Sequence, residues 1–458
     1  MHPAFVETAR DSAIPIWFVR KSNWPDIRDG LAPLARAFAE AMAFEPKPGR
    51  HLALPGPNGD IGGFLFGLED SAESANPMLP GSLPALLPRG AYRFANAAHD
   101  PRLAALAFAL GGYRFTKYRR RDDTVATLVP PEGVDAADLS RIADGVTLAR
   151  DLINTPSNDM GPAELHEATR LLAERHDAWI EVVTDSELLL KNFPLIHAVG
   201  RASARPPRLI DLRWGNPHHP TVTVIGKGVC FDTGGLDLKP ESAMLLMKKD
   251  MGGAAAALAL AHMVMDRKLP VALRVLIPAV ENSVSGGAFR PLDVYPSRRG
   301  LTVEVGNTDA EGRLILADAL AYADEAAPDL LIDIGTLTGA ARVALGPELV
   351  PFYTDSDTIA ASMMCHARRE RDPLWRMPLW APYDSMLDSK VADTNNVGGA
   401  FAGSITCALF LKKFVLDAKA WVHFDIYGWN PSGKPGRPEG GECQAARAIY
   451  ALLCERYG

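Results

Sequence analysis

The chain contains 458 residues, of which 47% are hydrophobic and 22% are charged, and its formal net charge is -7. This length exceeds what a single hydrophobic core ordinarily supports, so two domains are expected. The acidic balance argues against binding to nucleic acid through its phosphates, because such binding requires clustered Lys and Arg side chains. The five cysteines form no CxxC pair, which is typical of reduced thiols and favours a cytoplasmic location.

No targeting or membrane segment is expected. The N-terminal stretch, MHPAFVETARDSAIP, lacks the basic region followed by an apolar region that a signal peptide has. No stretch approaches about 18 uninterrupted apolar residues, the length that a membrane helix requires. We therefore expect no membrane partner.

Residues 1–133 are predicted to form a smaller α/β domain. Apolar and β-branched runs predict strands, whereas Leu, Ala and Phe at helical spacing predict helices. The predicted strands are residues 14–19 and 124–129, and the predicted helices are residues 25–44 and 101–110. A basic run, residues 117–121, is followed at once by Asp122 and Asp123, which indicates a solvated turn.

Residues 134–458 alternate between predicted strands and helices. The strands are residues 209–214, 221–226, 271–280, 301–305 and 329–335, and the helices include residues 252–265 and 312–326. Such runs predict an α/β fold whose central mixed, largely parallel sheet is covered by helices on both faces. Charged loops follow residues 221–226 and 301–305, and we expect both at one edge of that sheet, where ligands gather in such folds.

The segment VEVGNTDAEGRLILADAL, residues 303–320, joins a strand to a helix and carries Asp309, Glu311 and Arg313 at alternate positions. One interpretation is structural: a Thr-x-x-Glu capping box ends at Glu311, and Arg313 is a solvated helix residue. The other is functional. Side chains two residues apart on extended backbone point the same way, so a junction extended to about Gly312 directs both carboxylates to one site.

The other charged loop, residues 225–253, adds Asp232 and Asp250 to these two carboxylates. Carboxylate oxygens suit Mg and Mn and are acceptable to Zn. Four carboxylates cannot share a poorly solvated pocket without compensating charge, and two divalent ions would supply it. The functional interpretation is therefore a metal site.

These residues stand in motifs of a known family: the chain resembles the leucyl aminopeptidase (cytosol aminopeptidase) family of two-metal exopeptidases. The family's signature NTDAEGRL is complete at residues 307–314. The further motifs, in the family's order along the chain, are VIGKGVCFDTGGLDLKP, MKKDMGGAAA, SGGAFRPLDV, DIGTLTGA and VGGAFAGSITCALFLKKFV. The resemblance covers most of residues 145–430 and implies that residues 134–458 form the catalytic domain.

The resemblance implies a role for each candidate ligand. Asp232 and Glu311 would bridge two divalent ions, Asp309 would complete the shell of one ion, and Lys227 and Asp250 that of the other. An ammonium has no lone pair, so Lys227 can bind a metal only as the neutral amine. Mn or Zn is expected first, with Mg or Co as alternatives.

Lys239 and Arg313 would be catalytic without binding the metals. The resemblance implies that Lys239 stabilises the oxyanion of the tetrahedral intermediate, and that Arg313 holds a bicarbonate ion that relays protons. It also implies a substrate pocket formed by Met247, Asn307, Ala310, Thr336, Leu337 and Gly339.

The resemblance thus implies an aminopeptidase that releases leucine-like and other apolar residues from peptides with a free N-terminus, as a cytoplasmic homohexamer. The alternative from another class is a DNA-binding regulator that shares the aminopeptidase fold, against which the acidic composition argues. A catalytically dead scaffold is disfavoured, because the ligand and catalytic set is complete. The chain departs from the family at Leu292, where glycine is usual, at Thr233, where serine is usual, and at Gly335, where alanine is common.

Overall fold

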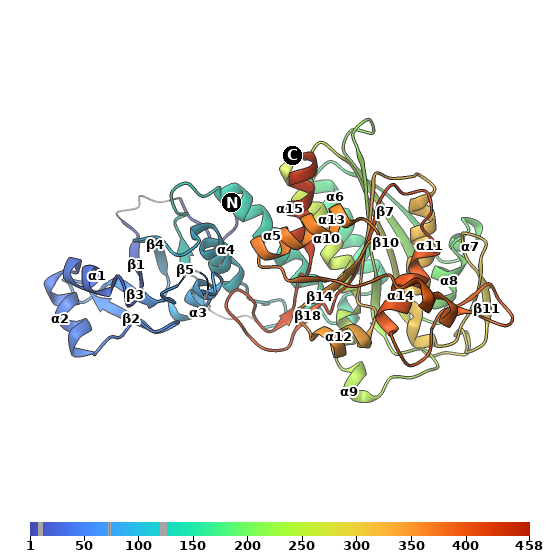
Figure 1. Cartoon of the computed structure of the whole chain (residues 1–458), viewed down its shortest axis with the longest axis horizontal. Helices are drawn as coiled ribbons and strands as arrows, with labels where there is room; N and C mark the ends of the chain where they lie inside the picture. The colour runs from blue at the N-terminus through green and yellow to red at the C-terminus, as the bar shows by residue number, and fades with distance from the viewer. Residues whose placement is uncertain (8–11, 72, 74, 120–125) are drawn as a thin grey trace. The chain divides into compact units, whose positions relative to one another are not determined.

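The computed structural model describes residues 1–7, 12–71, 73, 75–119 and 126–458, which fold into two compact units (Figure 1). The first unit comprises Met1–Thr147 with Ser432–Glu439, and the second comprises Leu148–Pro431 with Gly440–Gly458. Helix α5 (Ala136–Asn154) runs from the first unit into the second. The predicted boundary between residues 133 and 134 therefore stays a prediction.

The first unit contains a five-stranded sheet in the order β2-β3-β1-β4-β5, in which only the β2–β3 pair is antiparallel. Its strands are β1 (Ile14–Val19), β2 (His51–Pro55), β3 (Ile61–Gly67), β4 (Gly90–Phe94) and β5 (Ala126–Leu128). Its helices are α1 (Trp24–Gly30), α2 (Pro33–Ala41), η2 (Leu79–Ser82), α3 (Leu83–Leu86) and α4 (Pro101–Gly111).

Two predictions for this unit need correction or restriction. The single helix predicted over residues 25–44 is two helices, α1 and α2, because Ala32 precedes Pro33 and takes the extended conformation that a residue before proline prefers. Arg120 and Arg121 of the predicted turn lie outside the described residues, as do Asp122, Asp123, Thr124 and Val125. The described part of the predicted strand is β5.

The second unit is organised around a nine-stranded mixed sheet with the order β15-β14-β17-β13-β8-β10-β7-β6, and β9 pairs with β10. Its centre, β17-β13-β8-β10, is parallel, whereas β14, β7 and β6 each make an antiparallel pair. The strands are β6 (Trp179–Thr184), β7 (Arg208–Trp214), β8 (Thr221–Gly226), β9 (Gly228–Asp232), β10 (Ala272–Asn282), β13 (Leu330–Gly335), β14 (Val350–Tyr353), β15 (Leu374–Arg376) and β17 (Trp421–Asp425).

Helices cover both faces of this sheet, as predicted (Figure 1). Helices α10 (Gly252–Arg267), α15 (Ala446–Tyr457), α6 (Pro162–Arg175) and α13 (Asp357–Arg369) lie on one face, and α8 (Pro194–Gly200), α11 (Glu311–Asp324) and α14 (Gly403–Lys412) on the other. Because α10 approaches β13 closely, a Cβ at Gly253 would lie 2.1 Å from the carbonyl oxygen of Ile334. No helix among the described residues is long and apolar enough to cross a membrane.

The strand predicted at residues 301–305 does not belong to the central sheet. It is β12 (Thr302–Glu304), the middle strand of a separate three-stranded sheet with β11 (Val294–Pro296) and β16 (Thr394–Asn395). A short apolar run predicts a strand but not the neighbouring strand with which it pairs, because pairing is set by the tertiary fold. The two charged loops nevertheless meet, since Lys239 contacts Asp309.

Candidate metal and catalytic site

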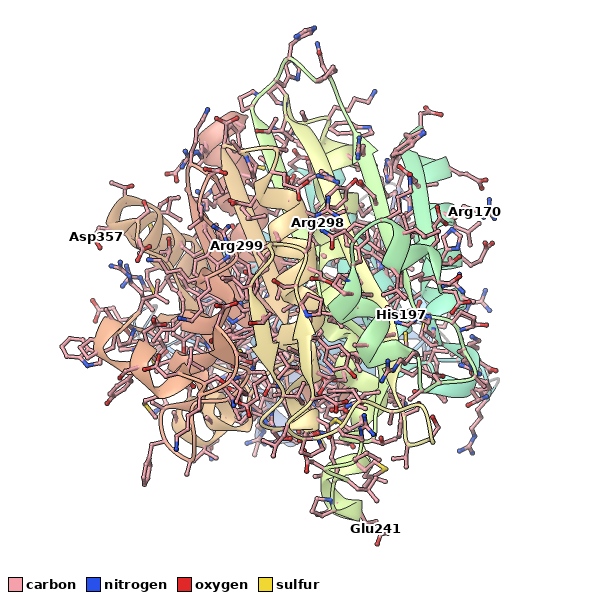
Figure 2. The ribbon with its side chains drawn as sticks, turned by 90° about the vertical axis from the view of Figure 1, so that its right-hand side faces the viewer. Arg170, His197, Glu241, Arg298, Arg299 and Asp357 are labelled. Atoms are coloured by element: carbon pink, nitrogen blue, oxygen red, sulfur yellow. The ribbon has the colours of Figure 1, made fainter. Side chains whose placement is uncertain are left out.

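The candidate site lies where several parallel strands of the second unit end. Lys227 follows β8, Asp232 is the last residue of β9, and Thr336 follows β13. Asp250 lies in the short 3-10 helix η4 (Met247–Met251) that precedes α10. The loop with Lys239 continues into α9 (Glu241–Met244), which projects from the body of the unit (Figure 2). The carboxyl ends of the strands thus gather residues from distant parts of the sequence.

The junction that carries Asp309 and Glu311 is not extended, which corrects the prediction. Residues Thr308–Ala310 form the 3-10 helix η5, and α11 begins at Glu311. The side-chain oxygen of Asn307 accepts a hydrogen bond from the backbone N–H of Asp309 at 2.7 Å, which caps the turn. Asparagine favours such local bonds to its own backbone, and here the bond fixes a tight turn instead of a strand.

The capping-box interpretation is also wrong, because Thr308 has other partners. Its hydroxyl donates to the carbonyl of Gly234 at 2.6 Å and accepts from the backbone N–H of Asp237 at 2.8 Å. No side chain caps α11 at its N-cap residue, Ala310. Thr308 therefore joins the two charged loops.

One half of the cluster is built around Lys227, which is 2% exposed. Its ammonium nitrogen lies 2.8 Å from Asp250 Oδ2 and 3.0 Å from Glu311 Oε1, and it donates to the carbonyl of Thr336 at 2.6 Å. The hydroxyl of Thr336 donates to Asp250 Oδ1 at 2.7 Å. Lys227 thus lies between two of the predicted ligands.

The other half is built around Lys239, whose ammonium nitrogen lies 2.9 Å from Asp232 Oδ2 and 2.5 Å from Asp309 Oδ1. Asp232 Oδ1 accepts hydrogen bonds from the side chain of Asn282 and the backbone of Gly234, each at 2.9 Å. All five predicted metal ligands and Lys239 are therefore brought together, although their catalytic roles stay predictions.

The crowding of carboxylates in a buried site perturbs their acidity. Burial raises the pKa of Glu311 to about 8, and the negative charge of Asp232 raises it further against the pull of Lys227. Burial and Asp232 likewise raise the pKa of Asp309 to about 6. Burial alone would lower the pKa of Lys227, but Asp250 and Glu311 outweigh it and raise that pKa above its ordinary value. A neutral amine at Lys227 therefore requires the additional charge of a metal.

The donor set fits divalent cations. One oxygen each of Asp232, Asp309 and Glu311 lies within 4.8 Å of the others. Glu311 Oε2 is buried and accepts no hydrogen bond within the described residues, while Asp250 Oδ2 and Asp309 Oδ1 have ion-pair contacts without an aligned donor. Buried carboxylate oxygens are ordinarily satisfied, so lone pairs that converge without donors match the needs of a hard cation.

Arg313 is not a solvated helix residue, because only 7% of it is exposed. It lies on the first turn of α11, and its Nη1 donates to the carbonyl of Asn396 at 2.6 Å. The side chain of Asn396 accepts from the backbone N–H groups of Gly306 and Asn307. The remaining guanidinium N–H groups have no protein acceptor within the described residues, which leaves Arg313 able to grip a small anion with two parallel bonds.

The predicted substrate residues surround this cluster in different ways. Thr336 contacts it directly, Asn307 caps η5, and Ala310 precedes Glu311. Met247 begins η4, Leu337 follows Thr336, and Gly339 begins α12 (Gly339–Leu345). Their contact with substrate stays a prediction.

Sequence reasoning missed the residues that hold these loops in place. Asn282 links Asp232 to the carbonyl of Thr308, and Asn396 supports the turn before Asp309. Asp425, at the end of β17, accepts hydrogen bonds from the backbone N–H groups of Leu337 and Thr338. Their functional signal is weak in sequence, since each is a single polar residue whose partners are dozens of positions away.

Comparison with known proteins gives a consistent result. The family profile described as cytosol aminopeptidase family, catalytic domain, matches residues 147–450, and the profile described as M17 aminopeptidase, N-terminal domain, matches residues 14–131. A probable cytosol aminopeptidase of Syntrophotalea carbinolica is 42% identical over 362 residues, which is 75% of this chain and 73% of the relative.

Two solved structures extend this similarity to the fold. The crystal structure of the cytosol aminopeptidase from Coxiella burnetii has a TM-score of 0.94 and 43% identity, and the match covers 99% of this chain and 100% of that chain. The bottromycin maturation enzyme BotP in complex with Mn has a TM-score of 0.88 and 32% identity, and the match covers 97% of this chain and 99% of that chain.

Gly312→Ala tests whether the position of Lys227 matters. A Cβ at Gly312 would lie 2.4 Å from Lys227 Cε and 2.8 Å from Leu337 Cδ2, so the lysine must move. We expect tight metal binding to weaken about 10-fold or more, as for a displaced ligand or its supporting residue, with little change in circular dichroism. Metal affinity is measured by calorimetric titration. Gly286→Ala, where a Cβ meets nothing within 4 Å, is the matched control. Equal affinity in the two variants would show that Lys227 is not a ligand.

A pH prediction follows from the raised pKa values of Glu311 and Asp309. Both groups hold protons more firmly in the folded protein than in a free carboxyl, and a metal binds only the ionised form. Metal affinity should therefore rise as the pH increases from about 6 to about 8, and binding at pH 7 should release protons. Calorimetric titration with MnCl2 in two buffers of different ionisation enthalpy measures this release. Binding without proton release at pH 7 would contradict the assigned environment.

Proposed function

Because the chain belongs to the cytosol aminopeptidase family, we propose that it is a metal-dependent aminopeptidase that releases N-terminal residues from peptides. The observation that carries this proposal is the largely buried cluster in which Asp232, Asp309 and Glu311 converge beside Lys227 and Lys239. A peptidase with such a site needs no nucleophilic side chain, because its carboxylates can hold cations that activate water.

In this proposal, two divalent ions are held by Lys227, Asp232, Asp250, Asp309 and Glu311, with Mn or Zn first and Mg or Co as alternatives. When bound, the ions supply an acidified water and electrophilic contacts for the scissile carbonyl and the free α-amine. Asp232 and Glu311 would bridge the ions: Asp232 Oδ2 lies beside Lys239 and Glu311 Oε1 lies beside Lys227, so each of the two carboxylates contacts one of the two lysines. Lys227 would serve as a ligand in its neutral form, since only the amine has a lone pair.

Lys239 and Arg313 act as the cationic residues of the reaction. The Lys239 ammonium is oriented by Asp232 and Asp309 and donates to the carbonyl oxygen as negative charge develops on it. Arg313, fixed through Nη1 to Asn396, orients a bicarbonate ion with its remaining N–H groups. A bicarbonate ion held there would offer a general base to the water.

The substrate is a peptide with a free N-terminus. Met247, Asn307, Ala310, Thr336 and Gly339 line the side-chain pocket, and the Leu337 carbonyl orients the backbone, with leucine-like and other apolar residues preferred first. Asp425 supports this arrangement, because it holds the N–H groups of Leu337 and Thr338. We further propose a cytoplasmic homohexamer.

Hydrolysis of aminoacyl-4-nitroanilides tests the proposed function. After chelation the protein should be inactive, and addition of Mn, Zn, Mg or Co one at a time should restore cleavage of the leucine substrate, because the ions activate the water. An N-acetylated substrate should be cleaved far more slowly than the substrate with a free α-amine, because the acetylated nitrogen cannot make the contacts of an amine. Equal rates on both substrates would contradict an exopeptidase.

Arg313 gives the sharpest test of the proton relay. Arg313→Ala should lower kcat by about 100- to 10,000-fold, the usual contribution of a general base, with a smaller change in KM and with unchanged metal content by elemental analysis. Arg313→Lys should be impaired as well, since an ammonium lacks the planar fork of a guanidinium. Bicarbonate added after degassing should stimulate the native protein but not Arg313→Ala. Full activity in Arg313→Ala would exclude the relay.

A further inference from the structure

Lys249, which the proposed reaction does not use, is a buried lysine without an ion-pair partner. It lies in η4 next to Asp250, and only 2% of it is exposed. Its ammonium nitrogen lies 4.5 Å from the centre of the Tyr427 ring. Within the described part of the chain, its side chain makes no hydrogen bond and no ion pair. A charged lysine so deeply buried is ordinarily paired, so this one offers a position for an anion.

A second cation faces the same ring. The guanidinium carbon of Arg342, on α12, lies 4.9 Å from the centre of the Tyr427 ring. Arg342 donates through Nη1 to the carbonyl of Thr338 at 3.2 Å, and no carboxylate pairs with it among the described residues. Lys249 and Arg342 thus form, with Tyr427, a cluster of two cations on one aromatic ring, which we call the cationic cluster.

The cationic cluster adjoins the predicted substrate pocket. A Cβ at Gly428, the residue after Tyr427, would lie 3.3 Å from Thr336 Cγ2 and 3.5 Å from the Lys249 carbonyl oxygen. A Cβ at Gly339 would lie 3.6 Å from Arg342 Nη2. Thr336 in turn bonds Asp250. Thr336 therefore lies beside both Asp250 of the metal site and Gly428, next to the cationic cluster.

The carboxylate next to Lys249 in the chain has other partners. Asp250, the chain neighbour of Lys249, is bound through one oxygen by Thr336 and is contacted at the other by Lys227. An apolar substrate side chain would give these cations no counter-charge, whereas a carboxylate would, and charge-assisted pairs are the stronger hydrogen bonds.

We propose that Lys249 and Arg342 bind the side-chain carboxylate of a substrate's N-terminal residue, so that the enzyme accepts N-terminal glutamate in addition to apolar residues. This inference rests on the proposed aminopeptidase function and names a second substrate class for the same site. Glutamate is the acidic residue chosen for the test, because its side chain reaches one methylene further than that of aspartate.

The test compares the α-(4-nitroanilides) of glutamate, glutamine and leucine. Glutamine has the shape of glutamate without its charge, so the ratio of kcat/KM for glutamate to that for glutamine isolates the charge. We expect this ratio to exceed one in the native enzyme and to fall about 10-fold or more in Lys249→Met, the loss typical of a hydrogen bond to a charged group. Activity on the leucine substrate should be retained, because methionine replaces the apolar stem of lysine without its ammonium group.

Two variants complete the design. Lys248→Met is the matched control, since the neighbouring Lys248 bonds the carbonyl of Asn154 and not the cationic cluster; its glutamate-to-glutamine ratio should equal that of the native enzyme. Arg342→Met, at a partly exposed position of α12, should lower the ratio as well. If Lys249→Met fails to fold, Arg342→Met decides the question by the same ratio.

The outcomes separate the two proposals. Cleavage of the leucine substrate without cleavage of the glutamate substrate overturns the inference and leaves the aminopeptidase function intact. A glutamate-to-glutamine ratio that stays unchanged in the folded variants also overturns it. If the variants instead lose activity on the dipeptide Leu-Gly but not on Leu-Gly amide, the cations bind the peptide's C-terminal carboxylate, and the inference is overturned as well. Failure to cleave any substrate with each metal restored would instead refute the proposed function.

Discussion

The structure of this site depends on one electrostatic constraint, the repulsion among carboxylates that share a buried volume. Asp232, Asp309 and Glu311 present oxygens within 4.8 Å of one another, and burial raises the pKa of Glu311 to about 8. Such an arrangement is unfavourable unless positive charge lies between the carboxylates. Lys227 and Lys239 supply part of that charge through short ion pairs. The same demand explains why the cluster suits divalent cations, which compensate several carboxylates at once.

Holding like charges together also requires a rigid frame, and neutral polar residues build it. Thr308 joins the loop of Asp309 to the loop of Asp232, while Asn282 contacts both. The side chain of Asn396 accepts a hydrogen bond from the backbone N–H of Asn307 before the turn, and its backbone carbonyl accepts one from Arg313. Most of these bonds are buried, so a lost partner would leave an unsatisfied group, which is costly. These hydrogen bonds therefore hold the carboxylates together against their mutual repulsion.

The chain differs from its family at Leu292, Thr233 and Gly335. Leu292 stands where glycine is usual and has a φ of 70°, in the left-handed region that favours glycine. Its side chain is largely exposed, so the backbone keeps its shape without a clash in the core. The other two departures lie beside the metal site: Thr233 follows Asp232 and donates its hydroxyl to the carbonyl of Asn282, and Gly335 is the last residue of β13, before Thr336. Gly312, which matches the family, leaves no room for a Cβ beside Lys227.

The sequence by itself determined the fold class, the family and the residues that meet at the site, because hydrophobic periodicity and charged motifs are local signals. It did not determine how the motifs are built. The segment at Asp309 and Glu311 is a turn and a helix start instead of extended backbone, and β12 lies outside the central sheet. Only the tertiary structure decided these points and identified Asn282, Asn396 and the unpaired Lys249. The physical reason is that a polar side chain has no fixed role until long-range packing sets its partners and its exposure to water.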